Sequence, residues 1–172
     1  MISSWHKPHL MNGLVIILIF AITGCPFLNK NKIQCQEYPK SIGYVNDFEH
    51  IFSSNHIDSL SSFLTDYEAL TTNEIAIVTV DSFSPDSSLE AYTFNLAQCW
   101  GVGKKNKNNG VVIVFSTALR QIHIQNGAGT TEELTNAETK QIIDNIITPS
   151  FKQTKYYEGI HNAVVAIMKE LE

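Results

Sequence analysis

The chain has 172 residues, of which 44% are hydrophobic and 17% charged, and its formal net charge is -5. This length and balance fit one globular domain preceded by a short leader, with enough apolar residues for a core. A mildly acidic chain with 12 Lys and Arg residues lacks the positive face that binding to a phosphate backbone needs, so we do not expect a nucleic-acid partner.

The chain begins with a segment typical of an exported protein. Residues 14–22 form an uninterrupted apolar run, which is shorter than the roughly 20 residues of a membrane-spanning helix and suits the apolar part of a signal peptide. Gly24 and Cys25 follow this run, and a small residue before a cysteine at this place resembles the lipobox of bacterial lipoproteins. We therefore predict a signal peptide over residues 1–24 and a lipid-bearing Cys25 that anchors the chain to a membrane.

Two other interpretations of this segment stay open. It could be an uncleaved anchor, or an ordinary secretory signal in which Cys25 has no role, because Lys7 is the only Lys or Arg before the apolar run. Translation could also start at Met11, which would leave no basic residue there. In each case the folded domain is exported. The lipidated form places it in the cell envelope, on the periplasmic or outer face of a membrane.

Residues 25–40 are polar and show no apolar periodicity, which predicts a flexible tether behind the lipid-bearing cysteine and a domain over residues 41–172. Cys35 lies in this tether and could pair with Cys99 in an oxidising compartment. Cys99, however, continues the apolar pattern of a helix, which favours a packed and unreactive free thiol. Sequence alone leaves both states open, because the geometry of the two residues decides between them.

Hydrophobic periodicity locates the elements of the domain. Apolar residues at helical spacing predict helices over residues 55–70, 88–100, 135–148 and 156–171. Short runs rich in β-branched residues predict strands over residues 74–80 and 111–115. An alternating run over residues 120–125 predicts a half-exposed hairpin partner for the second of them.

Residues at the ends of these elements support the assignments. Asn55 is the expected cap of the first helix, and Thr135 with Glu138 forms a capping box at the start of the third. Pro149 is expected to end that third helix. The order of helices and strands predicts an α/β fold, a three-layer αβα sandwich in which helices cover both faces of a small mixed sheet.

Oxygen-bearing side chains recur where the expected elements begin or end. Asp81 directly follows the first strand, at the edge where open α/β sheets bind their ligands. Similar residues at other element ends are Asp47, Asn108, Asn109, Asn136 and Glu138. Carboxylate, amide and backbone oxygens together suit a hard cation such as Ca2+ or Mg2+. Each residue alone also fits a turn or a helix cap, so both interpretations stay open at this point.

Taken in order, seven short motifs resemble those of the TPM-domain family, which occurs in bacterial envelope proteins and in thylakoid-lumen proteins of photosystem maintenance. The resemblance extends from Gly43 to Met168 and covers essentially the whole domain. The motifs are Gly43–Asp47, Glu74–Val80, Trp100–Gly103, Asn108–Gly110, Arg120–Ile124 with Gly127–Gly129, Leu134–Ala137, and Ile147–Phe151 ahead of Tyr157–Ile160.

The resemblance implies a Rossmann-like sandwich and a divalent-cation site formed by Asp47, Asp81, Asn109 and the loop around Asn136. Some members of the family resemble acid phosphatases, and others serve the assembly or repair of membrane complexes. This sequence has Asn136 where the family motif has an acid, and Ala128 where the motif has an aromatic residue. An amide keeps the oxygen ligand but removes its negative charge, which weakens the binding of a divalent ion.

Three functions follow as hypotheses. The first is a cation-binding, membrane-tethered accessory module for a membrane-protein partner. The second is a metal-dependent phosphomonoester hydrolase, in which Asp47 and Asp81 would be the catalytic candidates that hold the ion. In that enzyme, charge on the transferring group would be balanced by Lys104, Lys105 or Arg120. The third is an interaction module without a ligand. We place the first ahead of the others because it requires no catalytic base.

Overall fold

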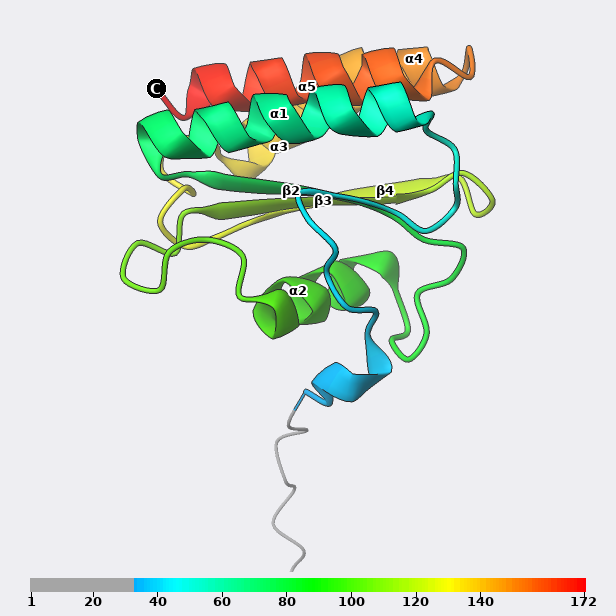
Figure 1. Ribbon diagram of the computed structural model, residues 1–172, viewed down its shortest axis with the longest axis horizontal. Helices are drawn as coiled ribbons and strands as arrows, with labels where there is room; N and C mark the ends of the chain where they lie inside the picture. Colours follow the sequence, from blue (N-terminus) through cyan, green and yellow to red (C-terminus); the bar gives the residue numbers. More distant parts are fainter. Residues whose placement is uncertain (1–32) are drawn as a thin grey trace, which may run out of the picture. The chain divides into compact units, whose positions relative to one another are not determined.

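Four strands form one mixed sheet in the computed structural model, which describes residues 33–172 (Figure 1). The strands are β1 (Val45–Asp47), β2 (Glu74–Thr79), β3 (Gly110–Ser116) and β4 (Gln121–Asn126). Their order in the sheet is β1-β2-β3-β4, with β1, β2 and β3 parallel and β4 antiparallel to β3. The expected strands and the expected hairpin are confirmed, and β4 lies at one edge of the sheet.

Helices cover both faces of this sheet (Figure 1). One face carries α1 (Ser54–Thr71), α3 (Asn136–Ile142), a π-helical turn (Ile143–Ile147), α4 (Thr148–Phe151) and α5 (Tyr156–Glu170). The other carries α2 (Leu89–Trp100) and a short 3-10 helix (Cys35–Glu37). The expected three-layer sandwich is therefore confirmed. Among residues 33–172, no helix is both long and apolar enough to cross a bilayer.

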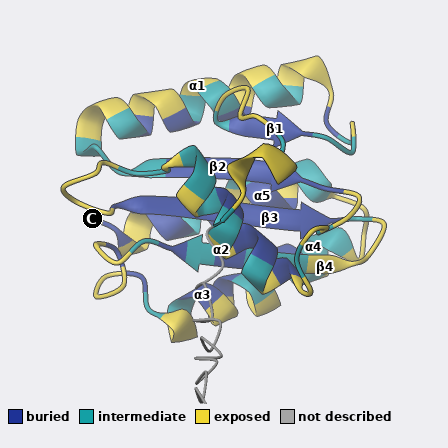
Figure 2. Cartoon of the chain, turned by 90° about the horizontal axis from the view of Figure 1, so that it is seen from below, coloured by how far each residue is buried: buried dark blue, intermediate teal, exposed yellow. Residues whose placement is uncertain are grey.

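The sheet separates two hydrophobic cores, because successive side chains of a strand point to opposite faces. Ile75 and Ile77 of β2 belong to the core under α1 and α5, whereas Ala76 and Val78 belong to the core over α2. Figure 2 shows the strands as buried elements, while the outer face of α1 is exposed. Burial on both faces explains why β2 and β3 are nearly continuous apolar runs.

Side-chain caps fix where two of the helices begin. Ser53, and not the expected Asn55, caps α1, and its Oγ accepts a hydrogen bond from the backbone N–H of His56 (3.2 Å). The expected capping box of α3 is confirmed. Thr135 Oγ1 accepts from the Glu138 N–H (3.3 Å), and the Glu138 carboxylate accepts from the Thr135 N–H (2.7 Å).

The helical segment continues past Pro149, contrary to the expectation that this proline ends it. In the π-helical turn the backbone N–H of Thr148 donates to the carbonyl of Ile143, five residues earlier. This wider turn places Pro149 in the first turn of α4, where a missing N–H removes no helical hydrogen bond. The segment therefore runs on to Phe151.

The packed domain begins earlier in the chain than expected. Residues 33–40, which the sequence suggested were part of a tether, lie against α2. Tyr38 is buried in the core on that side, and the Nε1–H of Trp100 donates to the carbonyl of Pro39 (2.8 Å). Buried polar–apolar contacts of this kind hold a backbone segment in place, so these residues belong to the domain.

A disulfide bond fastens this segment. Cys35 and Cys99 are linked, with their Cα atoms 5.3 Å apart. The expectation that Cys99 is a free, packed thiol was therefore wrong, and the alternative pairing is the one observed. The predicted signal peptide over residues 1–24 and the predicted lipid-bearing Cys25 lie outside the described residues.

Candidate functional site

Asp47 ends β1 at the edge where the parallel strands have their carboxyl ends. Its side chain is only 7% exposed, and both of its oxygens are engaged. Oδ1 accepts a hydrogen bond from Thr79 Oγ1 (2.7 Å), and Oδ2 accepts from the backbone N–H of Phe52 (2.8 Å). The carboxylate thus joins β1 to β2 and fixes the loop that leads into α1. Within the fold it acts as a structural acceptor.

Glu49, which sequence reasoning did not single out, connects the same edge to the end of β3. Its carboxylate accepts from the backbone N–H of Thr117 (2.9 Å) and of Ala118 (3.2 Å), and from Ser116 Oγ (3.3 Å). Its own N–H donates to Thr79 Oγ1 (2.9 Å). The only available signal was an acidic residue two positions after Asp47 in the same loop.

Asp81 lies in the loop after β2, at the same edge of the sheet as Asp47, and its side chain is exposed. In the described part of the chain its carboxylate has no hydrogen-bonded or ion-paired side chain that would position it. Asp47 is turned toward Thr79 and Phe52 instead of toward solvent. The two carboxylates therefore share an edge without forming the paired arrangement that the phosphatase hypothesis requires.

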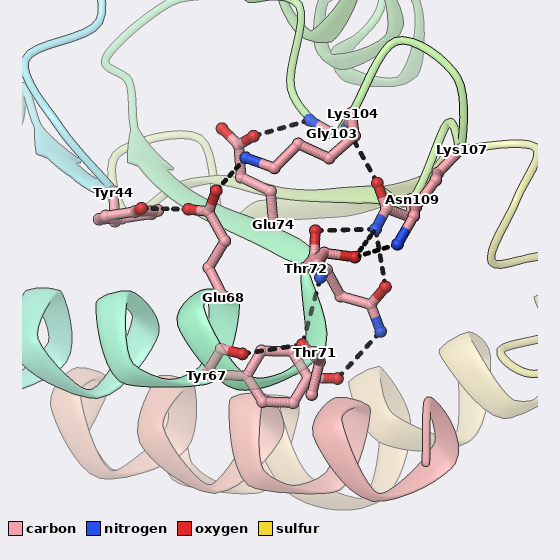
Figure 3. A network of polar contacts seen from close by, with 11 residues as sticks. Tyr44, Tyr67, Glu68, Thr71, Thr72, Glu74, Gly103, Lys104, Lys107 and Asn109 are labelled. Carbon is pink, nitrogen blue, oxygen red and sulfur yellow. Dashed lines mark hydrogen bonds and ion pairs between the residues drawn. The ribbon is translucent and has the colours of Figure 1, made fainter.

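Asn109 lies at the opposite edge, just before β3, inside a polar network that ties the end of α1 to the loop before β3 (Figure 3). Its side chain is 4% exposed. The amide Nδ2 donates to the Thr72 carbonyl (2.8 Å) and to Asn73 Oδ1 (2.9 Å), and Oδ1 accepts from the Lys104 N–H (2.9 Å). Asn109 thus supplies both donors and acceptors to the fold, which a carboxylate could not do.

Glu68 anchors the charged part of the same network (Figure 3). Its carboxylate accepts from the Tyr44 hydroxyl and forms an ion pair with Lys104. Burial raises the pKa of Glu68, but the hydrogen bonds from Lys104 and Tyr44 outweigh burial and lower it overall. The same bond to Glu68, together with burial, raises the pKa of Tyr44 to about 12. Lys104 is thus committed to a structural pair.

The loop around Asn136 also lies at this second edge, because β4 runs antiparallel to β3 and ends beside its start. Asn136 is exposed and is the first residue of α3. The two glycines of the preceding loop serve close packing. A Cβ on Gly127 would lie 2.1 Å from the carbonyl oxygen of Asn108, and one on Gly129 would lie 1.8 Å from that of Lys107.

The four expected cation ligands are therefore divided between two edges of the sheet. Asp47 and Asp81 lie at the carboxyl ends of the parallel strands, and Asn109 and Asn136 lie at the other edge. The seven residues of β3 separate the edges by roughly 20 Å, so no single ion can contact both pairs. In residues 33–172, moreover, no three His, Cys, Asp or Glu side chains are grouped so that they could hold a metal. The expected four-residue site does not form.

The cationic candidates are divided in the same way. Lys104 and Lys105 belong to the loop before β3, at the edge that holds Asn109, whereas Arg120 lies in the turn between β3 and β4. Of the three, Arg120 alone shares an edge with Asp47 and Asp81. The lysines therefore cannot balance charge on a group bound near those carboxylates.

Known proteins share this fold. The sequence profile of the TPM domain matches residues 45–170. The N-terminal domain of a protein from P. gingivalis is 29% identical in sequence with a TM-score of 0.67, and the match covers 74% of this chain and 81% of that one. None of the curated proteins compared with the chain matches it.

Two more distant solved structures show the fold alone. The N-terminal domain of the cg2496 protein from Corynebacterium glutamicum is 21% identical with a TM-score of 0.59, and the match covers 79% of this chain and 85% of that one. The BA42 protein from Bizionia argentinensis is 15% identical with a TM-score of 0.63, with 72% and 83% covered.

Proposed function

The chain belongs to the TPM-domain family, and we propose that it is an exported, membrane-tethered accessory module that serves a membrane-protein partner. The observation that carries this proposal is the Cys35–Cys99 disulfide. Disulfides persist in oxidising compartments such as the periplasm and the cell surface, and are rare in reducing ones. The bond therefore supports the export that the leader predicts.

The disulfide also lies close in sequence to the predicted anchor. Cys25 precedes Cys35 by ten residues, and Cys35 is fastened to α2. A lipid on Cys25 would thus hold the domain on a short segment, within about 35 Å of the membrane surface even if that segment were fully extended. Proximity of this kind favours action on a protein of the same membrane.

The use of the candidate ligands within the fold favours an accessory role over hydrolysis. Both oxygens of Asp47 accept hydrogen bonds from the protein, and Asn109 is saturated by its neighbours. A divalent cation does not fit these residues as one site, so we derive no catalytic step through a metal. An accessory module needs only a stable surface, which the packed sheet and its covering helices provide.

Photo-cross-linking in cells tests this proposal. A photoreactive residue is placed at Leu70 or at Ile42, whose apolar side chains are 85% and 75% exposed. We expect a discrete cross-linked membrane protein with the wild-type leader and its loss in Cys25→Ala, with Val165 on α5 as a second position for comparison. Cross-links that persist unchanged in Cys25→Ala would contradict the tethered role.

A phosphatase assay tests the competing enzyme. The purified chain is incubated with p-nitrophenyl phosphate and millimolar Mg2+ or Ca2+, and we expect no turnover that depends on Asp81. Hydrolysis that is lost in Asp81→Asn, while the fold is retained, would replace the accessory role with metal-dependent hydrolysis.

A further inference from the structure

A cavity of about 490 Å3 opens where the β3–β4 turn meets the α4–α5 segment. Figure 1 shows these two connections at the same end of the sheet. This is the carboxyl-end edge of β3, the side on which open α/β sheets bind their ligands. The volume lies in the range of pockets for small molecules.

The charged side chains that line this cavity are all positive. Arg120 comes from the β3–β4 turn and Lys152 from the end of α4, and no acidic side chain is part of the lining. Both are exposed, and neither belongs to the two ion pairs found among residues 33–172. In a chain with a net charge of -5, two unpaired cations that face one cavity favour an anionic ligand.

Glu49 is the acidic group nearest to this cavity, and its carboxylate is already engaged. It accepts the backbone N–H groups of Thr117 and Ala118 at the start of the turn. These bonds fix the turn that carries Arg120. A bound anion would consequently be held by the side chains of Arg120 and Lys152, and not by the backbone donors of the turn.

The cavity also has an apolar wall. Phe151 packs edge-on against Tyr156, with ring centroids 5.0 Å apart, and Ile122 of β4 lies beside them in the lining. Rings packed in this geometry form a firm surface that can accept a hydrocarbon or aromatic group. The ligand that suits both walls carries its charge at one end and an apolar portion at the other.

Two lining residues have a left-handed backbone, which is rare outside glycine. Arg120 has φ 54° and Thr154 has φ 58°, and Thr154 is β-branched, for which this conformation is an outlier. Strained residues persist where the surrounding structure requires them, and they cluster at binding sites. Both flank the same cavity, which agrees with a site whose shape is maintained.

We propose that this cavity binds a small organic anion, with Arg120 and Lys152 as partners of its phosphate or carboxylate group and the wall of Ile122, Phe151 and Tyr156 as the seat of its apolar portion. The site is separate from the expected cation ligands. It does not depend on membrane tethering, so its test is independent of the accessory role proposed above.

Amide NMR of the full chain in nonionic detergent micelles tests the site with three probes. Phenylphosphonate and benzoate carry the two oxyanion types on an aromatic ring, and benzyl alcohol is the neutral control. We expect saturable shifts at residues 116–122 and 148–156 with at least one anion and none with benzyl alcohol. The anion that binds more tightly identifies the charged group of the ligand.

Matched charge variants decide whether the two cations act. Arg120→Gln and Lys152→Gln should each weaken binding about tenfold, as expected for the loss of one charge-assisted hydrogen bond. Lys105→Gln removes the same charge at the other edge of the sheet and should leave Kd unchanged. The absence of saturable shifts at millimolar probe would overturn the proposal. So would equal binding by wild type and both cavity variants, or an equal loss in Lys105→Gln.

Discussion

Asp47 and Asn109 lie at opposite ends of the same sheet, with Asp47 beside the last residue of β2 and Asn109 just before the first residue of β3. Each is buried, and each satisfies backbone groups of a neighbouring loop. Their separation divides the expected cation site, and their hydrogen bonds give them structural roles. These roles lead to stability measurements that differ from those expected of metal ligands.

Asp47→Asn should lower the free energy of unfolding by about 2 kcal/mol, the cost of leaving a buried hydrogen-bonding group without its partner. The amide that replaces one carboxylate oxygen cannot accept from either the Phe52 N–H or the Thr79 hydroxyl. Urea denaturation measures the loss. The matched control, Asp81→Asn, changes an exposed carboxylate and should stay within about 0.5 kcal/mol of wild type. Equal effects of the two substitutions would argue against the structural role.

Asn109→Asp separates the structural role from the ligand role, because the two predict opposite results. A restored acid at a cation site would raise Ca2+ affinity. In this structure the new carboxylate would face the Thr72 carbonyl and Asn73 Oδ1, so we expect a loss of about 2–3 kcal/mol in unfolding free energy. Asn136→Asp is the control, since an acid in the first turn of α3 should be neutral or slightly stabilising. Ca2+-dependent stabilisation of Asn109→Asp would contradict the assignment.

The Glu68 pair predicts a specific dependence of stability on pH. The pKa of Glu68 is lower in the folded chain than its ordinary value of 4.5. A depressed carboxyl pKa gives stability that is fully present above the unfolded value and is lost as pH falls through the folded value. Glu68→Gln should therefore cost most near neutral pH, about 1 kcal/mol because Lys104 is largely solvated. The difference from wild type should shrink below pH 4.5, and a cost that is constant with pH would rule this explanation out.

Reduction of the Cys35–Cys99 disulfide should destabilise the domain markedly. The bond closes a segment of 64 residues that includes β1, α1, β2 and α2, and chain-entropy arguments assign about 4 kcal/mol to a loop of this length. Urea denaturation with and without reductant gives the difference. Cys35→Ser should reproduce the reduced chain, and Cys25→Ser should not. An unfolding midpoint that ignores reductant would show that the bond is absent in solution.

Burial explains which elements could be predicted from the sequence. The strands β2 and β3 are covered on both faces, so their apolar runs stand out, and β4 shows the alternation of a half-exposed edge strand. By contrast, β1 has three residues, two of them Asn46 and Asp47, which are uncommon in strands. Its start is held by the Asn46 side chain, which accepts from the Ile42 N–H (2.7 Å), and no periodicity reveals such a contact.

The candidate site was harder to predict than the fold, because residues near strand ends can lie at either edge. Asp81 follows its strand and Asn109 precedes its own, so parallel pairing places them at opposite edges. The disulfide was equally hidden, since a separation of 64 residues gives no indication that the two Cα atoms lie 5.3 Å apart. Whether a buried oxygen is free for a ligand also depends on tertiary contacts, such as those of Asp47 with Thr79 and Phe52.

The most direct test of the exported, membrane-tethered role is mass spectrometry of the chain purified from its native membrane without reductant. We predict a mature chain that begins at Cys25 with a lipid on that residue, and a linked peptide pair that contains Cys35 and Cys99. A chain that keeps residues 1–24, or that has free thiols at Cys35 and Cys99 after extraction under thiol-blocking conditions, would contradict the proposal.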